Sequence, residues 1–225
     1  MLTADEILDK LNAHADPAQL PGMARYGMST ENRLGVKIPV LRALAKQVGR
    51  QHALALDLWA SGIAEARILA AMIADPAQLT GEQMDAWVAD FDSWDVCDQV
   101  CMNLFDKSPL ALEKVHAWAG REEEFVRRAA FALIACIAWH DRNAEDQLFI
   151  DLLPVITQGA TDERNYVKKA VSWALRHIGK RNRALNRAAV AAAKQLQACS
   201  SRAARWVASD ALRELTGKAV QSRLC

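Results

Sequence analysis

A repeated helical segment is the feature that most restricts how this chain can fold. Five segments share one pattern, in which charged or polar residues precede a run of small and aliphatic residues. They are EARILAAMIAD from residue 65, DVCDQVCMNLF from 95, VRRAAFALIAC from 126, YVKKAVSWALR from 166 and RWVASDALREL from 205. Their spacing of about 30–40 residues is typical of an array of stacked structural repeats.

The whole chain is expected to be all-α, because helix formers dominate and Gly and Pro fall mainly between amphipathic segments. Thr3-x-x-Glu6 is a capping box that begins a helix over 3–14. A less regular stretch over 23–39 follows it. Further helices are expected near 39–49, 52–61, 64–74, 81–91, 93–106, 109–119, 122–139, 144–158, 163–180, 183–198 and 202–216.

Taken in pairs, these helices predict a HEAT-like helical-repeat solenoid, which is an α-α superhelix with a concave basic groove. The solenoid is expected to form a single domain over 1–225. A compact bundle without repeats is the alternative. The 52% hydrophobic content supplies ample core for either arrangement.

The sequence predicts a soluble, cytoplasmic protein. The N-terminal residues place acids early and lack the basic-then-apolar pattern of a signal peptide. The longest uncharged apolar run, 129–139, is too short to cross a bilayer. No membrane association and no obligate protein partner are therefore expected.

The cysteine pattern predicts neither a metal site nor a cofactor. The five cysteines are Cys97, Cys101, Cys136, Cys199 and Cys225, without a C-x-x-C motif or a nearby pair of histidines. Two of them, at 97 and 101, share one helix face, where reduced thiols serve as core filler.

Charge is distributed unevenly along the chain, although the net charge is only +1. Residues 1–112 hold 9 Lys+Arg against 15 Asp+Glu, whereas 113–225 hold 19 against 12. Within the second half, 164–225 carries 14 basic residues and only Asp210 and Glu214 as acids. One end of the molecule should be strongly positive, either as a polyanion-binding surface or as an ordinary solvated helix surface.

The helix expected near 93–106 carries an aromatic residue and a carboxylate beside its buried face. That face is formed by Val96, Cys97, Val100, Cys101, Leu104 and Phe105. Trp94 and Asp98 lie together on its flank, roughly 80–120° from the centre of the apolar stripe. They are therefore expected at the rim of a groove and not inside the core.

The helix expected near 163–180 places a tryptophan among cations. Its buried face is formed by Val167, Val171, Ala174, Leu175 and Ile178. Trp173 points roughly 145° away from that face, and its neighbours on the helix surface are Lys169, Arg176 and Lys180. An exposed indole in a cationic stripe favours a binding surface. Packing of Trp173 against a neighbouring repeat is the alternative.

One arginine on the helix near 122–139 is a candidate phosphate contact. Arg128 precedes Ala132 and Ala135 along one helix edge, so its guanidinium should stand over a low surface that a phosphate can approach. The planar fork of donors suits phosphate geometry. Arg127 is expected to be a solvated neighbour.

Other tryptophans are assigned by the same criterion. Two fall on apolar faces and are expected in the core, namely Trp87 and Trp118. Trp206 and Asp210 repeat the W-x-x-x-D spacing of the first pair, but Asp210 is expected mainly to balance Arg213 and Arg202.

Indole rings, one carboxylate and a basic stripe suggest chemistry on a cationic group attached to a polyanion. Cation–π contact favours positive charge over tryptophan, and a carboxylate favours it further. The phosphates would be held by Arg128, Lys169, Arg176 and Lys180. An N-alkylated purine in DNA is such a cationic group.

Five pieces of the sequence match a known family in their order and spacing. They are TENRLGVKIPVLR at 30–42, EARILAAMIAD at 65–75, SWDVCD at 93–98, EEEFVRRAAFAL at 122–133 and VKKAVSWALR at 167–176. Over nearly its full length the chain resembles the AlkD-like family of DNA alkylation-repair glycosylases, which are built from HEAT-like repeats. The resemblance implies a DNA glycosylase that excises N3- and N7-alkylated purines from double-stranded DNA without flipping the base.

The resemblance also implies roles for individual residues. The family's W-D-x-x-D segment matches Trp94, Asp95 and Asp98, of which Asp98 would be the catalytic aspartate. Trp94 and Trp173 would contact the deoxyribose of the lesion, and Arg128 would contact a phosphate. The chain departs from the pattern at position 93, where serine stands in place of a frequent tryptophan, and at position 97, where cysteine replaces a common valine.

Two other functions are compatible with the same residues. A catalytically silent module that binds bent or branched DNA would share the basic stripe but would not need Asp98. A protein-interaction scaffold, a common use of HEAT-like arrays, would show negligible affinity for nucleic acid at physiological salt. His177 either contacts DNA or occupies a helix C-terminus, where partial positive charge is favourable.

Overall fold

The computed structural model describes residues 2–224, which form helices and connecting turns with no strand among them. The chain divides into two compact units, one ending at Pro109 (unit 1) and one beginning at Leu110 (unit 2). None of the helices over the described residues combines the length and the hydrophobicity that a bilayer crossing requires.

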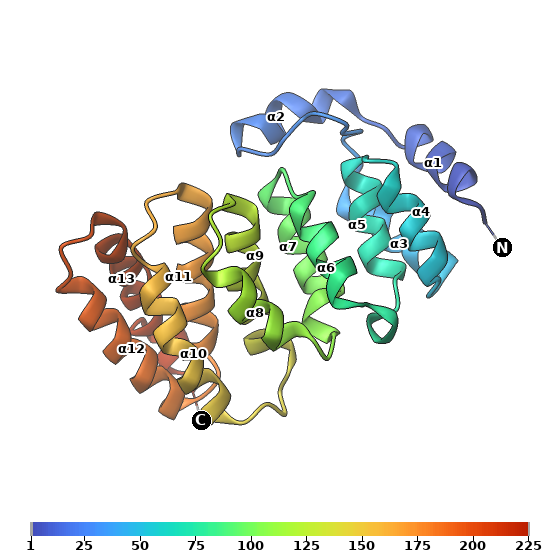
Figure 1. Ribbon diagram of the computed structural model, residues 1–225. Helices are drawn as coiled ribbons and strands as arrows, with labels where there is room; N and C mark the ends of the chain where they lie inside the picture. The colour runs from blue at the N-terminus through green and yellow to red at the C-terminus, as the bar shows by residue number, and fades with distance from the viewer. Residues whose placement is uncertain (1, 225) are drawn as a thin grey trace. The chain divides into compact units, whose positions relative to one another are not determined.

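Unit 1 is organised around α5 (Figure 1). Its helices are α1 (Ala4–Ala13), α2 (Leu20–Arg25), α3 (Ile38–Val48), α4 (His52–Ala60), α5 (Ala64–Ile73), α6 (Gly81–Ala89) and α7 (Trp94–Asn103), with the 3₁₀ turns η1 (Pro17–Gln19), η2 (Pro76–Gln78) and η3 (Phe105–Lys107). Helix α5 packs against α3, α4 and α7. The indole rings of Trp59 and Trp87 stack in the core with their centroids 3.9 Å apart.

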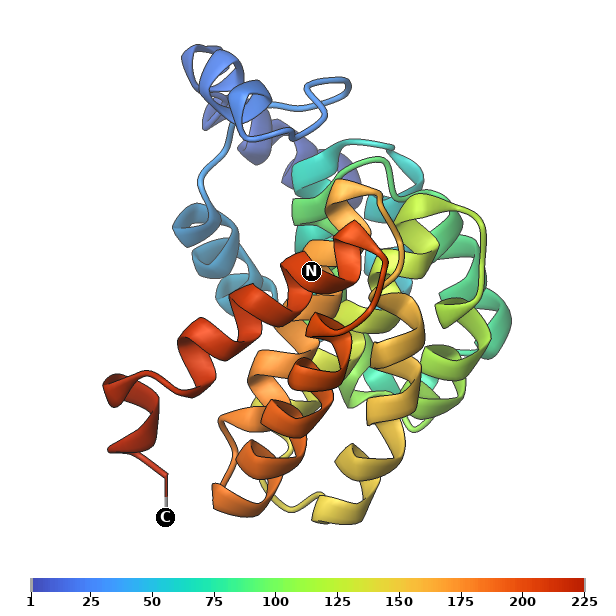
Figure 2. The same cartoon turned by 90° about the vertical axis from the view of Figure 1, so that its left-hand side faces the viewer.

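Unit 2 is a two-layered stack of helices (Figure 2). Its helices are α8 (Ala111–Ala119), α9 (Glu124–His140), α10 (Asp146–Gly159), α11 (Asn165–Gly179), α12 (Arg183–Gln197), α13 (Arg202–Leu215) and α14 (Lys218–Gln221). One layer holds α9, α11 and α13 with α11 in the middle, and α10 lies between α8 and α12 in the other layer. At Gly159 a Cβ atom would lie 2.1 Å from the Phe131 ring, so close packing here requires glycine.

The structure confirms the all-α prediction and the repeat that underlies it. The five repeated segments lie on α5, α7, α9, α11 and α13, and the last three of these form one layer of unit 2. Division into two compact units is compatible with an array in which each repeat contacts mainly its neighbours. The single domain over 1–225 stays a prediction.

Two local features differ from the sequence prediction. The helix expected over 93–106 ends at Asn103, because Leu104 leaves the helical region with φ −135°, and η3 follows it. The short helix α2 is not among the expected helices; it contains Pro21 in its first turn, where a proline is well tolerated. This short helix precedes the loop that supports α7.

Candidate functional site

Trp94 and Asp98 lie at the edge of the buried face of α7, as the helical periodicity predicts. The apolar residues of this face, from Val96 to Cys101, are at most 1% exposed, whereas Trp94 and Asp98 are both partly exposed. The positions are one helical turn apart, so the indole and the carboxylate share one side of the helix. Their position outside the core is confirmed, whereas the groove beside them and their catalytic role stay predictions.

The first turn of α7 is held by a network of polar side chains. Asp95 receives two parallel hydrogen bonds from the guanidinium of Arg33, at 2.7 Å and 3.0 Å. The buried hydroxyl of Ser93 donates to the same carboxylate and accepts a hydrogen bond from the backbone N–H of Ser29. Both side chains of the Arg33–Asp95 pair are largely buried, so the geometry at the start of α7 is strongly specified.

The loop that carries this arginine is itself fixed by a buried carboxylate. Glu65 on α5 is 1% exposed and accepts hydrogen bonds from the backbone N–H groups of Leu34, Gly35 and Val36, at 3.0, 2.8 and 3.2 Å. Gly35 has φ +81°, and a Cβ there would lie 2.2 Å from the carbonyl oxygen of Asp16. The sequence pieces TENRLG and EARILA are therefore held together by these hydrogen bonds.

A backbone group from α2 orients Trp94. The indole N–H of Trp94 donates to the carbonyl oxygen of Tyr26 at 3.0 Å, and Tyr26 is the C-cap residue that follows α2. The Tyr26 side chain itself is 77% exposed. Trp94 is thus tethered at its polar edge while part of its ring remains accessible.

Arg128 is more deeply placed than the sequence analysis expected. It is 5% exposed, and its Nη1 donates to the backbone carbonyl of Tyr166 at 2.6 Å. Ala132 and Ala135, expected to form a low open surface, are fully buried, so this edge of α9 packs inside unit 2. Arg127, expected to be solvated, pairs with Asp162 at 3.2 Å.

Trp173 is half-buried on α11 beside the exposed Lys169. Its ring meets the imidazole of His177 edge-on, with the centroids 5.8 Å apart. Burial, reinforced by the charges of Lys180 and Arg176, lowers the pKa of His177 to about 4. The imidazole is therefore neutral at physiological pH and adds aromatic surface, but no positive charge, next to Trp173.

Two of the predicted phosphate contacts are engaged in ion pairs within unit 2. Arg176 binds Glu214 at 2.5 Å, and Lys180 binds the other oxygen of the same carboxylate at 2.8 Å. Burial opposes the charge of Glu214, but the hydrogen bonds from Lys180 and Arg176 outweigh it and hold the pKa of Glu214 below its ordinary value. The expectation of an open cationic stripe is thus wrong for these two residues, because α13 packs against α11 and brings Glu214 onto it.

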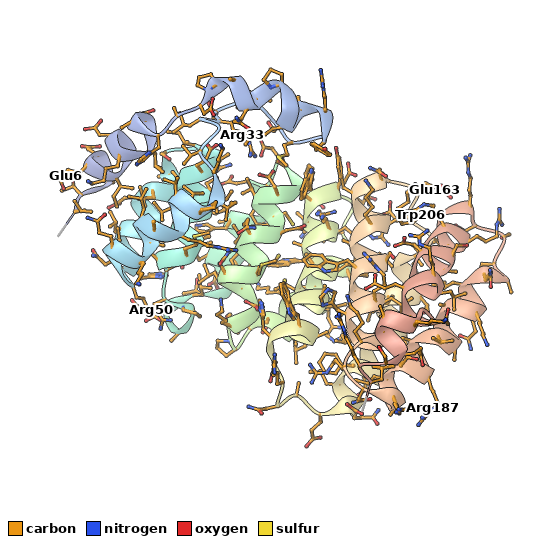
Figure 3. All side chains as sticks on the ribbon, turned by 180° about the vertical axis from the view of Figure 1, so that it is seen from behind. Glu6, Arg33, Arg50, Glu163, Arg187 and Trp206 are labelled. Atoms are coloured by element: carbon orange, nitrogen blue, oxygen red, sulfur yellow. The ribbon has the colours of Figure 1, made fainter. Side chains whose placement is uncertain are left out.

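Trp206 and Asp210, the second tryptophan–aspartate pair, each contact different residues. Asp210 pairs with Arg213, as predicted, and also accepts a hydrogen bond from Ser172 at 2.7 Å. Trp206 is 38% exposed and lies beneath the ammonium group of Lys168. In Figure 3 Trp206 appears at the same end of unit 2 as Glu163.

Sequence reasoning missed the supports of α7. Neither Arg33 nor the Tyr26 carbonyl was singled out, although TENR was part of a matched segment. It also missed Trp139, which is 50% exposed at the end of the apolar run 129–139. Within residues 2–224 no grouping of three or more His, Cys, Asp or Glu side chains is arranged to hold a metal ion.

Comparisons with known proteins give a family and a fold. Residues 7–215 match the family described as "DNA alkylation repair enzyme". A search of curated proteins gave no match. One solved structure, described as "A new family of proteins related to the HEAT-like repeat DNA glycosylases with affinity for branched DNA structures", is similar with a TM-score of 0.75 and 20% sequence identity. The match covers 86% of this chain and 83% of that chain, and it confirms the HEAT-like repeat fold.

Proposed function

Because the chain belongs to the DNA alkylation repair enzyme family, we propose that it is a DNA glycosylase that releases N3- and N7-alkylated purines from duplex DNA without base flipping. One observation carries this proposal. Trp94 and Asp98 are partly exposed together on α7, and a buried network of charged groups fixes the turn from which they project. A surface that served only for packing would not need this support.

The proposed reaction depends on the positive charge of the damaged base. Alkylation at N3 or N7 makes the purine a cationic leaving group, so the electron pair of the glycosidic bond moves to the base and neutralises it without an added proton. Positive charge then develops on the deoxyribose. The Asp98 carboxylate stabilises this oxocarbenium-like state and orients the water that adds to C1′, and the proton that this water loses passes to the solvent. The products are the free alkylated base and an abasic site.

The two half-buried tryptophans have a related role in this proposal. The faces of Trp94 and Trp173 stabilise the developing cation through cation–π contact. Phosphates are bound most directly by the exposed Lys169, whereas Arg176 and Lys180 reach them by exchanging the Glu214 carboxylate for phosphate oxygens. Arg128 then acts from a largely buried position.

A second candidate function is a non-catalytic module for bent or branched DNA. It is favoured by the similar solved structure, whose description names affinity for branched DNA. Such a module would use the cations of unit 2 and would leave Asp98 without a role, because a carboxylate near phosphates repels them.

The deciding experiment measures release of free 7-methylguanine from a defined duplex. Wild type and Asp98→Asn are compared at matched DNA occupancy, with Asp92→Asn as the control because Asp92 is an exposed acid just before α7. We expect Asp98→Asn to bind DNA normally and to lose roughly a hundredfold or more in excision rate. Binding without excision by wild type, with 3-methyladenine as well, would favour the non-catalytic module. Efficient release of uracil would contradict the mechanism, because uracil is a neutral leaving group.

A further inference from the structure

A concave pocket of about 550 Å³ lies in unit 2, where α9 and α11 end and α12 begins. Its lining includes Trp139, Arg142, Asp146, His177, Lys180 and Asn182. None of the predicted site residues except Lys180 belongs to this lining. The pocket is therefore distinct from the surface around Trp173, although the two share α11.

The pocket presents an aromatic surface. Trp139 is 50% exposed, whereas the ten residues before it on α9 are at most 5% exposed. Its ring is stacked with His140 at 4.9 Å and tilted against His177 at 5.6 Å. Since His177 also contacts Trp173, a row of aromatic rings runs from the pocket to Trp173 within unit 2. An indole this exposed is a preferred platform for stacking a planar ligand.

The pocket also presents cations whose position is built into the fold. Arg181 forms part of the pocket wall. Its guanidinium donates to the carbonyl oxygens of Ala138, Asp141 and Ala144 at 2.8, 2.7 and 3.1 Å. These bonds fix the turn that carries the exposed Arg142.

The remaining charges of the lining leave an excess of cations. Lys180 is two-thirds covered, and its ammonium group is paired with Glu214 at 2.8 Å, so it binds an anion only by exchanging this carboxylate. The acid of the lining, Asp146, is occupied by two contacts with the amide of Asn182 at 2.8 and 3.0 Å. Arg142 is therefore directly available to an anion, and Lys180 becomes available when it leaves Glu214.

We propose that this pocket holds an unpaired nucleotide of a DNA strand, with its base stacked on Trp139 and its phosphate bound by Arg142 and Lys180. The combination of a stacking ring and a cationic groove is how proteins hold single strands without sequence preference. The inference rests on DNA being the ligand of the proposed function, and it adds a preference for DNA with an unpaired end or flap. His140 stacks on Trp139, and the neutral His177 ring, which is tilted against the same indole, lines the pocket without adding a charge that would compete for the phosphate.

The test uses a duplex with a short single-stranded flap that contains 2-aminopurine, whose fluorescence falls when the base stacks. Wild type should bind the flapped duplex more tightly than the blunt duplex and should quench the probe. Trp139→Ala should lose roughly fivefold or more in flap affinity together with the quench. Trp139→Phe should retain part of both, which excludes misfolding as the cause.

Matched controls isolate the pocket. Trp206→Ala removes a comparably exposed tryptophan of α13 and should leave flap binding unchanged. Arg142→Ala should reduce the salt dependence of flap binding by about 0.7 in the logarithmic slope, whereas Arg187→Ala, which removes an exposed arginine of α12, should not.

Three outcomes would overturn the inference. The first is equal affinity of wild type for the flapped and the blunt duplex, and the second is unchanged flap binding by Trp139→Ala. The third is displacement of the flap by micromolar deoxyadenosine monophosphate, which would assign the pocket to a free nucleotide. Excision of 7-methylguanine is followed in parallel. If 7-methylguanine is excised but flap binding does not depend on Trp139, only this inference fails. If flap binding depends on Trp139 but no alkylated base is released, only the glycosylase proposal fails.

Discussion

The ion pairs beside α7 and those along α11 use the same residue types in opposite ways. In unit 1 the side chains of Arg33 and Asp95 are 2% and 15% exposed, and their pair fixes the turn that presents Trp94. In unit 2 Arg176 and Glu214 are 28% and 31% exposed, so solvent screens their attraction. Buried pairs are costly to break from one side, whereas partly exposed ones exchange partners easily. The first arrangement suits a rigid reaction site and the second suits a surface that opens to phosphate.

The strongest test of this contrast is removal of Arg33. Arg33→Met leaves the Asp95 carboxylate buried without its guanidinium, and we expect the free energy of unfolding to fall by about 3 kcal/mol or more. Excision should fall as well, even at temperatures where the variant is folded, because the first turn of α7 loses its support. Urea unfolding and single-turnover excision measure the two effects.

The matched control is Arg50→Met. Arg50 is 66% exposed on the side chain and pairs with Asp75 at 3.5 Å, so its loss should change stability by less than about 1 kcal/mol. Equal effects of the two substitutions would show that the buried pair does not specify the start of α7.

The next largest effect is a pH dependence located in unit 2. His177 has a folded-state pKa of about 4 against 6.5 in the unfolded chain, so the unfolded state binds an extra proton between these values. Its contribution to stability is therefore complete above about pH 6.5 and is lost as the pH falls toward 4. We expect wild type to lose roughly 1–3 kcal/mol more than His177→Gln over this interval.

Urea unfolding at about pH 7, 5.5, 4.5 and 3.5 separates the effect of His177 from that of the carboxylates. Glu214 has a lowered pKa, so the stability that it contributes is present above the ordinary value of 4.5 and is lost only as the pH falls further. The glutamine variant should flatten the profile between about pH 7 and 4.5 and should retain the loss of stability below about pH 4.5. A profile identical to wild type would show that His177 is not buried in the neutral form.

A smaller effect distinguishes the two tryptophans. Trp94→Phe removes the indole hydrogen bond to the Tyr26 carbonyl, which is worth about 0.5–1.5 kcal/mol, so excision should slow roughly threefold to tenfold. Trp173→Phe keeps a ring against His177 and should slow it less. Single-turnover rates at saturating enzyme measure both. The reverse order would show that the tether to α2 does not orient Trp94.

The fold was predictable because the repeat pattern is local. Each of the five repeated segments carries its own apolar stripe, and stripes of this period form one face of a helix wherever it packs. The same reasoning placed Trp94 and Asp98 at the edge of α7 and Trp87 and Trp118 in the core. It worked wherever the answer depended on one helix alone.

The environment of the cations was not predictable, because it depends on the neighbouring helices. A helical wheel shows that Arg176 and Lys180 leave the core, but their partner Glu214 is 38 and 34 residues further along the chain. Similarly, Arg128 faces outward from its own stripe and is nevertheless covered, because its guanidinium reaches the first turn of α11. Long side chains take their partners from the packing of repeats, which one helix does not encode.

The smallest predicted effect addresses the Glu214 carboxylate directly. Glu214→Gln removes the negative charge that pairs with Arg176 and Lys180. Lys180 then becomes available to phosphate, whereas Arg176 keeps its second partner, Asp210, at 3.6 Å. We expect the salt dependence of duplex binding to steepen by about one unit in the logarithmic slope, with somewhat tighter binding at low salt.

Glu113→Gln makes the same change of charge at an exposed position of α8 and should alter the slope much less. The two variants are compared by fluorescence anisotropy titrations between about 50 and 200 mM salt. Over this roughly fourfold range, the loss or gain of one phosphate contact is readily resolved. An unchanged slope for Glu214→Gln would mean that the α11–α13 ion pairs do not open on DNA, and phosphate binding would then rest on Lys169 and its exposed neighbours.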